Sequence, residues 1–296
     1  MEQVILVTGA TDGLGRATAC ELAARGAAVL LHGRDRGKLD AVLSQTRAAT
    51  GNDRLRGYLA DLASLDEVRG LAAQVQDHEP RLDVLINNAG VGGIARSESR
   101  DGYELNFAVN HLAHFLLTTS LLGLLRRSAP ARIVNVSSAG QSRIDFDDVM
   151  LTRRYDPMDA YARSKLAQIM FTVELADRLR AEGEHGVTVT ALHPATLMDT
   201  KMVRQSFGAP LSSVEQGVEA TVRLALSNDV EGVSGQYFDG LRPARPHRQA
   251  RDRDARRRLW QLSEQLVDAA LQAGAADASQ RRPTGRSSST DGPAAA

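Results

Sequence analysis

The stretch VILVTGATDGLGRATACELAARG, residues 4–26, decides the fold. It opens with a short apolar run at 4–8, which predicts a buried parallel strand. The run meets GATDGLG at 9–15 and then a pattern typical of a helix. Glycines let the backbone approach a pyrophosphate closely, and a helix N-terminus favours its negative charge. Taken alone, the glycine pattern is open to two interpretations, a nucleotide site or an ordinary strand–helix turn; its place directly after the first strand favours the nucleotide site.

The same alternation of strand and helix continues along the chain. It predicts an α/β fold, a Rossmann-like doubly wound sheet that is mostly parallel and seven-stranded, with helices on both faces in a single domain. Ligands are then expected outside the carboxyl ends of the strands. The further predicted strands are 28–32, 55–59, 82–86, 132–136, 187–192 and 235–238, and the predicted helices are 36–49, 64–77, 102–127, 156–183 and 212–227.

The composition of the chain changes after residue 240. Residues 1–240 are expected to form the nucleotide-binding catalytic domain. Residues 241–274 form an extension with eight arginines at 242–258 and an amphipathic helix at 254–271 around Trp260. Residues 275–296 are rich in Ala, Ser, Arg, Gly and Pro, a composition that predicts a disordered tail.

The overall composition excludes several classes of protein. Basic and acidic residues are equal at 36 each, so net charge predicts no nucleic-acid partner. Cys20 is the only cysteine, which excludes an intrachain disulfide. We expect no leader peptide, because the N-terminus runs directly into a strand, and no membrane insertion, because no apolar run approaches about 20 residues. The expected location is cytoplasmic, and no metal is expected.

Tyr161 and Lys165 lie on the predicted helix 156–183, which begins with the helix-start pair Asp156–Pro157. Residues four apart share one helix face. An ammonium beside a phenol favours the phenolate and lowers the tyrosine pKa. Such a pair is also common by chance on solvated helix surfaces, so it indicates chemistry only in company with other motifs.

Those motifs are present, and the chain resembles the short-chain dehydrogenase/reductase family over residues 1–240. The resemblance rests on motifs in the family's order: TGATDGLG at 8–15, Asp61, NNAG at 87–90, Asn110, the serines at 137–138, and YARSK at 161–165. It is similar to the retinol-dehydrogenase-like branch in a longer segment between Ser138 and Tyr161, and in HGRD, DGYELNFAVNHLAHFLLT, IDFDD, SKLAQ and His193–Pro194.

The resemblance implies a catalytic tetrad. Tyr161 would be the general acid in reduction and the general base in oxidation. Lys165 would lower the Tyr161 pKa and bond the nicotinamide ribose, Ser138 would hold the substrate oxygen, and Asn110 would anchor a water that relays protons to Lys165. The alternative is structural: a turn cap at Asn110, a loop hydrogen bond at Ser138, and merely buried histidines at 111 and 114.

The resemblance also implies a cofactor site. Asp61 would accept from the adenine amino group, or would instead cap the following helix. The loop after Pro194 departs from the family, with Ala195 in place of glycine and the nicotinamide-contacting threonine, Thr200, one residue late. The expected cofactor-binding residues are Thr8, Gly9, Thr11, Gly13, Leu14, Gly15, Arg34, Asp61, Leu62, Asn88, Ala89, Gly90, Tyr161, Lys165, Pro194, Thr196 and Thr200.

The end of the second strand predicts the choice of cofactor. An acidic residue there would accept the ribose 2′-hydroxyl of NAD, whereas an arginine suits the 2′-phosphate of NADP. Gly33 occupies the aligned position and Arg34 follows it, while Asp35 falls two residues late by strand register. We therefore expect NADP(H) to be favoured over NAD(H), unless Arg34 is only a surface charge.

The expected function is an NADP-dependent carbonyl reductase or alcohol dehydrogenase. Apolar residues in the segments 139–160 and 195–210 suit a lipophilic substrate, or simply pack those segments on the body: Phe146, Met150, Leu197, Met198, Met202, Val203 and Phe207. Two other classes stay open, a nucleotide-sensing regulatory protein on the same fold and a nucleic-acid or membrane binder using the arginine run. A homodimer or homotetramer pairing through helices 102–127 and 156–183 is also expected.

Overall fold

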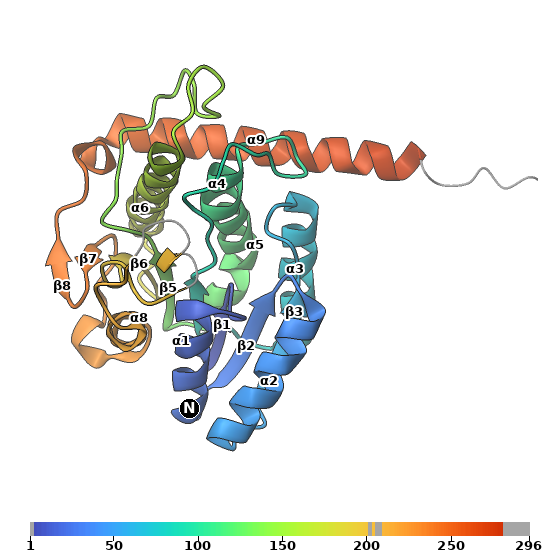
Figure 1. Ribbon diagram of the computed structural model, residues 1–296, viewed down its shortest axis with the longest axis vertical. Helices are drawn as coiled ribbons and strands as arrows, with labels where there is room; N and C mark the ends of the chain where they lie inside the picture. The colour runs from blue at the N-terminus through green and yellow to red at the C-terminus, as the bar shows by residue number, and fades with distance from the viewer. Residues whose placement is uncertain (1–2, 201–202, 205–208, 281–296) are drawn as a thin grey trace, which may run out of the picture.

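The sheet of the computed structural model has eight strands in the order β3-β2-β1-β4-β5-β6-β7-β8 (Figure 1). The structure describes residues 3–200, 203–204 and 209–280. Seven strands run parallel and β8 is antiparallel to β7. The strands are β1 Val4–Val7, β2 Ala28–Gly33, β3 Leu55–Leu59, β4 Val84–Asn87, β5 Ala131–Val136, β6 Val187–His193, β7 Tyr237–Asp239 and β8 Arg242–Ala244. The Rossmann-like α/β prediction is confirmed, with one strand more than expected.

Helices cover both faces of the sheet, and each face has its own apolar core. The cores divide the strands by pleat: Ile5 and Val7 face one side, while Leu6 faces the other. On the first side lie α1 Gly13–Ala24, α2 Arg36–Thr50 and α8 Val214–Leu226. On the second lie α3 Leu65–His78, α5 Ala113–Arg127 and α6 Pro157–Ala181, and the remaining short turns are α4 Leu105–Phe107, η1 Ala108–Leu112, η2 Asn228–Val230 and η3 Arg248–Arg251.

The helix predicted at 102–127 begins later and is interrupted. Glu104 caps it by accepting from the backbone N–H groups of Asn106 and Phe107. Its second turn, η1, is π-helical, a feature frequent at functional sites. Contrary to the sequence expectation, Leu105–Arg127 is long and apolar enough to cross a membrane by length and composition. Since 78% of its apolar window is buried inside the protein, it packs as a core helix.

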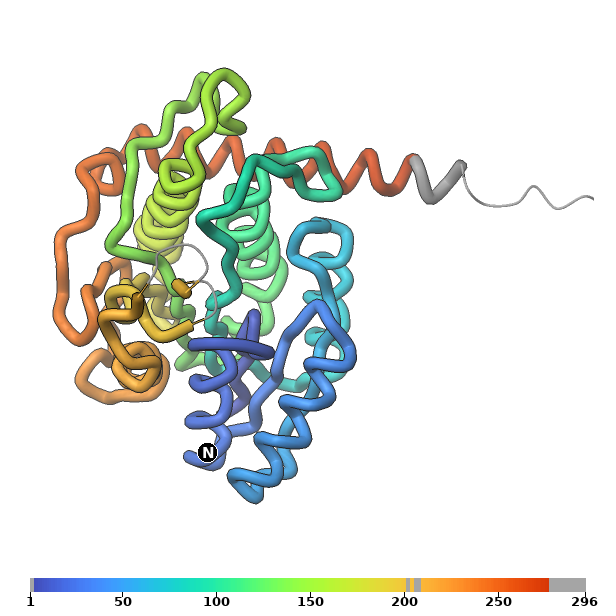
Figure 2. Tube along the Cα trace, viewed as in Figure 1, coloured from blue at the N-terminus to red at the C-terminus, as the bar shows by residue number. Residues whose placement is uncertain are grey.

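The C-terminal extension forms a helix, α9 Arg253–Gln280, that lies across the outside of α6 and α3 (Figures 1 and 2). Trp260 is the centre of the contact. Its ring lies 5.0 Å from that of Phe115 and 5.8 Å from that of Phe171, and the Arg178 guanidinium lies 4.0 Å from its centroid. The helix continues beyond the boundary expected at residue 275, and the tail from 281 lies outside the described residues.

Buried charge also fastens α9 to α6. Arg256, only 6% exposed, donates to Asp177 at 2.7 Å and lies 3.5 Å from the buried carboxylate of Glu174. Farther along, Arg258 donates to Asp147 in the segment between β5 and α6. Part of the arginine run is therefore used within the chain. The helix α9 thus packs on α6, one of the two helices through which pairing of two copies is expected.

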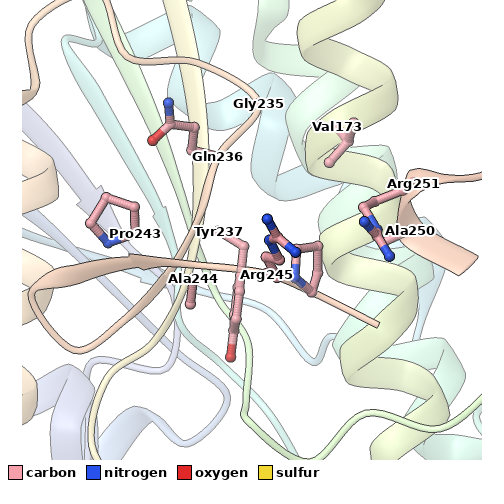
Figure 3. A pocket seen from close by; sticks show the side chains of 10 residues that line it. Val173, Gly235, Gln236, Tyr237, Pro243, Ala244, Arg245, Ala250 and Arg251 are labelled. Atoms are coloured by element: carbon pink, nitrogen blue, oxygen red, sulfur yellow. The ribbon is translucent and has the colours of Figure 1, made fainter. Parts of the chain in front are cut away.

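A cleft of about 400 Å³ lies at the β7–β8 edge of the sheet, between that edge, α6 and η3 (Figure 3). Tyr237 and Ala250 form its buried part, while Arg245 and Arg251 stand at its exposed side. The Tyr237 hydroxyl leaves the cleft and donates to the Ser138 carbonyl at 3.1 Å. The cleft wall is therefore joined to the end of β5.

Replacing Trp260 by alanine tests how firmly α9 is docked. Removing a buried aromatic side chain commonly costs about 3–5 kcal/mol in the free energy of unfolding. We expect a loss of that order in chemical denaturation. The control is Arg257→Ala, which removes an exposed side chain from the same helix and should change the free energy by less than about 0.5 kcal/mol. Equal stability of the two variants would show that α9 does not pack on the domain.

Candidate active site

The four expected catalytic residues converge at the carboxyl ends of β4 and β5. Ser138 follows β5, Tyr161 and Lys165 lie on the second and third turns of α6, and Asn110 lies in η1. Gly90 sits among them: a Cβ added there would lie 3.2 Å from Asn110 Oδ1 and 3.5 Å from Lys165 Nζ. Residues far apart in sequence are thus assembled at one point.

Tyr161 and Ser138 are hydrogen-bonded through their side chains. Burial raises the pKa of Tyr161, and the bond to Ser138 offsets part of that rise. The Tyr161 ring packs closely against the chain after NNAG, since a Cβ added to Gly92 would overlap Tyr161 Cδ2. The phenol is therefore protonated at neutral pH and can act as a proton donor.

Lys165 is almost fully buried, and its ammonium lies 5.7 Å from the centroid of the Tyr161 ring. Nζ donates to the Val136 carbonyl and to Gln168 Oε1, each at 2.9 Å. Burial lowers the pKa of Lys165 to about 7. From the sequence, the charge of Lys165 was expected to lower the Tyr161 pKa. The structure differs because desolvation drives both groups toward their neutral forms.

Asn110 uses its side chain to hold neighbouring segments together. Oδ1 accepts from the Val91 N–H at 2.8 Å, and Nδ2 donates to the Val91 carbonyl at 2.9 Å and to Ser164 Oγ at 2.8 Å. It therefore clamps η1 to the chain after NNAG and to α6. The proposed water relay would use other atoms of this residue.

The glycine turn and NNAG form one continuous surface. Gly9 has φ +66°, and a Cβ there would lie 2.8 Å from Ala89 Cα. Thr8 Oγ1 accepts from the N–H groups of Asn88 and Ala89 at 2.9 and 3.0 Å. Gly15 has no room for a Cβ beside the Asn88 side chain and the Gly9 carbonyl. This close approach of bare backbone at the start of α1 fits a pyrophosphate.

The loop after β6 reaches the same helix N-terminus. Asp12 caps α1 at the Gly13 N–H, and a Cβ on Gly13 would lie 3.3 Å from Thr200 Cγ2. Thr196 Oγ1 lies 3.1 Å from His193 Nε2. Leu197 has φ +46°, so the loop keeps a strained left-handed residue. Thr200 thus faces the glycine turn although Ala195 departs from the family pattern.

Some of the apolar residues expected over the substrate pack on the body of the protein. Phe146 and Met150 pack against the α5–α6 core and Met198 against the opposite core. Met202 and Phe207 lie outside the described residues. The packing alternative therefore holds for these three side chains; of the other two described residues, Val203 is buried and Leu197 is half-buried.

Asp61 does not cap α3. Its Oδ1 accepts from the Ala63 N–H at 3.1 Å, and its carboxylate lies 3.7 Å from the exposed guanidinium of Arg100. Ser64 is the cap of α3, accepting from the Glu67 N–H. Leu62 beside it is buried. The Asp61 carboxylate, 24% exposed, is thus left at the sheet edge, where an adenine amino group could reach it.

At the end of β2, Arg34 is exposed and makes no hydrogen bond or ion pair within the part of the chain that the structure describes. Asp35 caps α2 by accepting from the Lys38 N–H at 2.9 Å, so its carboxylate has a structural role. The space beside Gly33 is filled by Thr11, whose Cγ2 an added Cβ would overlap. Gly33 is therefore required by Thr11, a reason that the sequence did not show.

Two buried histidines were given no role in the site from the sequence. His32 Nδ1 accepts from the Gly9 N–H at 3.2 Å, so its Nε2–H donates to the Ala60 carbonyl at 3.0 Å. Burial lowers the pKa of His32 to about 4, so the ring stays neutral and holds the glycine turn to β3. His114 Nε2 lies 3.1 Å from Thr8 Oγ1, and its Nδ1 lies 3.1 Å from the Asn110 carbonyl. In the sequence, the two histidines were visible only as parts of the motifs HGRD at 32–35 and NHLAH at 110–114.

The sequence profile described as short chain dehydrogenase matches residues 3–209. Human retinol dehydrogenase 13 is 41% identical over 283 residues, which cover 90% of this chain and 84% of that protein. A crystal structure of an uncharacterized protein from Mycobacterium paratuberculosis has a TM-score of 0.71 at 32% identity, covering 90% and 93% of the two chains. A short chain dehydrogenase from Escherichia coli complexed with NADPH has a TM-score of 0.67 at 28% identity, covering 80% and 96%.

The chain belongs to the short-chain dehydrogenase/reductase family, NAD(P)-dependent oxidoreductases that act on CH–OH groups. Within the family it is retinol-dehydrogenase-like. The family and branch expected from the sequence motifs are thereby confirmed. Among the described residues, no group of three or more His, Cys, Asp or Glu side chains is placed to hold a metal ion.

The burial of Lys165 should make the free energy of unfolding depend on pH. Between about pH 7 and pH 10 the unfolded chain holds a proton on Lys165 that the folded chain lacks, so raising the pH favours the folded state at this site. The free energy of unfolding of the wild type, relative to Lys165→Met, should rise across that interval. Chemical denaturation of both proteins at several pH values measures the difference. A difference independent of pH would show that the Lys165 pKa is ordinary.

Proposed function

We propose that this protein is an NADP-dependent carbonyl reductase and alcohol dehydrogenase for lipophilic substrates. The observation that carries the proposal is the hydrogen-bonded Ser138–Tyr161 pair beside Lys165, at the carboxyl end of β5 and next to a glycine turn shaped for a pyrophosphate. A regulatory protein on this fold would have no need of the complete tetrad.

Each residue has a role in that chemistry. The glycine turn and the N-terminus of α1 would hold the pyrophosphate, Asp61 the adenine, and Lys165 the nicotinamide ribose. The nicotinamide, when bound, supplies or accepts the hydride. Ser138 would bond the substrate oxygen, and the Tyr161 hydroxyl would give that oxygen its proton in reduction and take it back in oxidation.

The relatives support a lipophilic substrate. Several proteins about 40% identical to this chain over most of their length are retinol dehydrogenases. We infer that this chain acts on an extended apolar alcohol or aldehyde of similar chemistry. The cofactor is NADP(H), supported by the exposed Arg34 and by the NADPH complex of the similar E. coli protein. We propose further that the protein works in the cytoplasm without inserting Leu105–Arg127 into a membrane, since that helix is buried in the core.

Replacing Tyr161 by phenylalanine tests the acid–base assignment. Only the hydroxyl is lost, so the melting temperature and NADPH affinity should be kept. The turnover number for an aldehyde panel should fall by about 10²–10⁴-fold. The matched control is Tyr103→Phe, which removes a hydroxyl that donates to the Leu266 carbonyl, away from the site. A Tyr161→Phe enzyme with more than about a tenth of wild-type turnover, when chemistry limits the rate, would rule Tyr161 out.

Replacing Arg34 by alanine tests the cofactor assignment. A charge-assisted bond to the 2′-phosphate is worth roughly 1.5–3 kcal/mol, about 10- to 150-fold in affinity. Wild type should prefer NADPH over NADH by that order, and Arg34→Ala should lose most of the preference by weakening NADPH alone. Dissociation constants are compared at fixed ionic strength, with Arg47→Ala on the following helix, α2, as the control for lost charge. Equal weakening of both cofactors would contradict the assignment.

A further inference from the structure

Lys165 donates a hydrogen bond to a side chain of its own helix, α6. Among the described residues, its Nζ has one side-chain acceptor within hydrogen-bond distance, Gln168 Oε1 at 2.9 Å, and one backbone acceptor, the Val136 carbonyl. Lys165 is 4% exposed and Gln168 is 1% exposed. An ammonium has donors only, and burying it without acceptors is costly. The hydrogen bond that Lys165 donates to Gln168 Oε1 therefore favours the charged form of Lys165.

The orientation of the Gln168 amide follows from the same chemistry. Because Nζ can only donate, Gln168 must turn its oxygen toward Lys165, and its Nε2 then lies 3.4 Å from the ring of His114. The Gln168 backbone is held as well, since its carbonyl accepts from Thr172 Oγ1 at 2.8 Å. The amide is thus placed before any ligand binds.

His114 is itself fixed from both sides. Thr8 Oγ1 accepts two backbone N–H groups and lies within reach of two further partners, the Ile86 carbonyl at 3.4 Å and His114 Nε2 at 3.1 Å. On its other side, His114 Nδ1 lies 3.1 Å from the Asn110 carbonyl and 3.4 Å from Gln168 Nε2. Burial lowers the pKa of His114 to about 3, so it brings no charge toward Lys165 at neutral pH.

We propose that Gln168 is a positioning residue for Lys165, holding its ammonium at the end of β5 where it faces Gly90 and Tyr161. The inference rests on the proposed function, because it assigns Lys165 a part in catalysis. The titratable groups that face Lys165 are Tyr161 on its own helix and His114 on α5, and no described carboxylate bonds to it. Gln168 is thus the one described side chain whose hydrogen bond stabilises the Lys165 ammonium against the desolvation that lowers its pKa.

Two substitutions of similar shape distinguish the effect of the Gln168 side-chain carbonyl, as an acceptor for Lys165, from the effect of its packing. Gln168→Met keeps the length of the side chain and removes the acceptor, whereas Gln168→Glu keeps the shape and adds a negative charge. The pKa of Lys165 should fall in the first and rise in the second, each by about one unit, a tenfold change in proton affinity. Thr221→Val, which removes a buried hydroxyl from α8 on the opposite face of the sheet, is the control and should leave that pKa unchanged.

The measurement is NMR of ε-¹³C-lysine-labelled protein across a pH titration. The chain has only three lysines, Lys38, Lys165 and Lys201, so Lys165 is assigned from the signal missing in Lys165→Met. Should Gln168→Met fail to fold, Gln168→Asn takes its place, since it withdraws the carbonyl by one methylene and should also lower the pKa. Wild-type pKa values in the Gln168 variants would overturn the proposal.

The pH dependence of turnover gives a second readout that a purely structural role would not move. The alkaline limb should shift in the same direction as the Lys165 pKa, downward for Gln168→Met and upward for Gln168→Glu. A shifted pKa with an unshifted limb would also overturn the positioning role. The Tyr161→Phe test is separate: retained activity there would defeat the proposed function, while the titration would still decide whether Gln168 holds Lys165.

Discussion

Buried amide and hydroxyl groups fasten the carboxyl ends of the central strands to the helices above them, and the site depends on these bonds. Asn87 at the end of β4 donates to Asn135 on β5 at 2.8 Å and to Thr118 on α5 at 2.9 Å. Asn135 donates in turn to Thr172 on α6 at 2.8 Å. Leaving any of these polar groups buried without a partner would cost about 1–3 kcal/mol. A shift of α5 or α6 along the sheet would break several such bonds together, so the helices that carry Asn110, Tyr161 and Lys165 have one favoured position.

Desolvation sets the chemistry of the proposed acid–base pair. Burial raises the pKa of Tyr161 and lowers that of Lys165, so each moves toward neutrality. A protonated phenol bonded to Ser138 is suited to donate a proton to a developing alkoxide. The contribution of the Lys165 ammonium to this chemistry then depends mainly on its position. In this structure it is held by the end of β5 and by Gln168, with Gly90 leaving the space between it and Asn110 open.

Local sequence signals predicted most of the fold. Side-chain contacts between residues far apart in the sequence were not predicted. Asp156–Pro157 and the glycine turn are short-range signals, and both lie where expected. The strand β8 was missed because Arg-Pro-Ala has no apolar alternation. The composition of the alanine-rich end of α9 predicted disorder, although alanine is the best helix former. The tetrad residues were named from family motifs, whereas the contacts of His32, His114 and Gly33 depend on partners 20 or more residues away that no local pattern reveals.

The central claim is that this site moves a hydride between NADP(H) and a lipophilic carbonyl or alcohol. The most direct measurement uses NADPH carrying deuterium at C4 of the nicotinamide, a panel of lipophilic aldehydes including retinal, and mass spectrometry of the alcohols formed. The account predicts an alcohol with a single deuterium, on the carbon that bears the new hydroxyl, from one of the two C4-labelled epimers only. Alcohols without deuterium from either epimer, or no alcohol from any member of the panel, would contradict it.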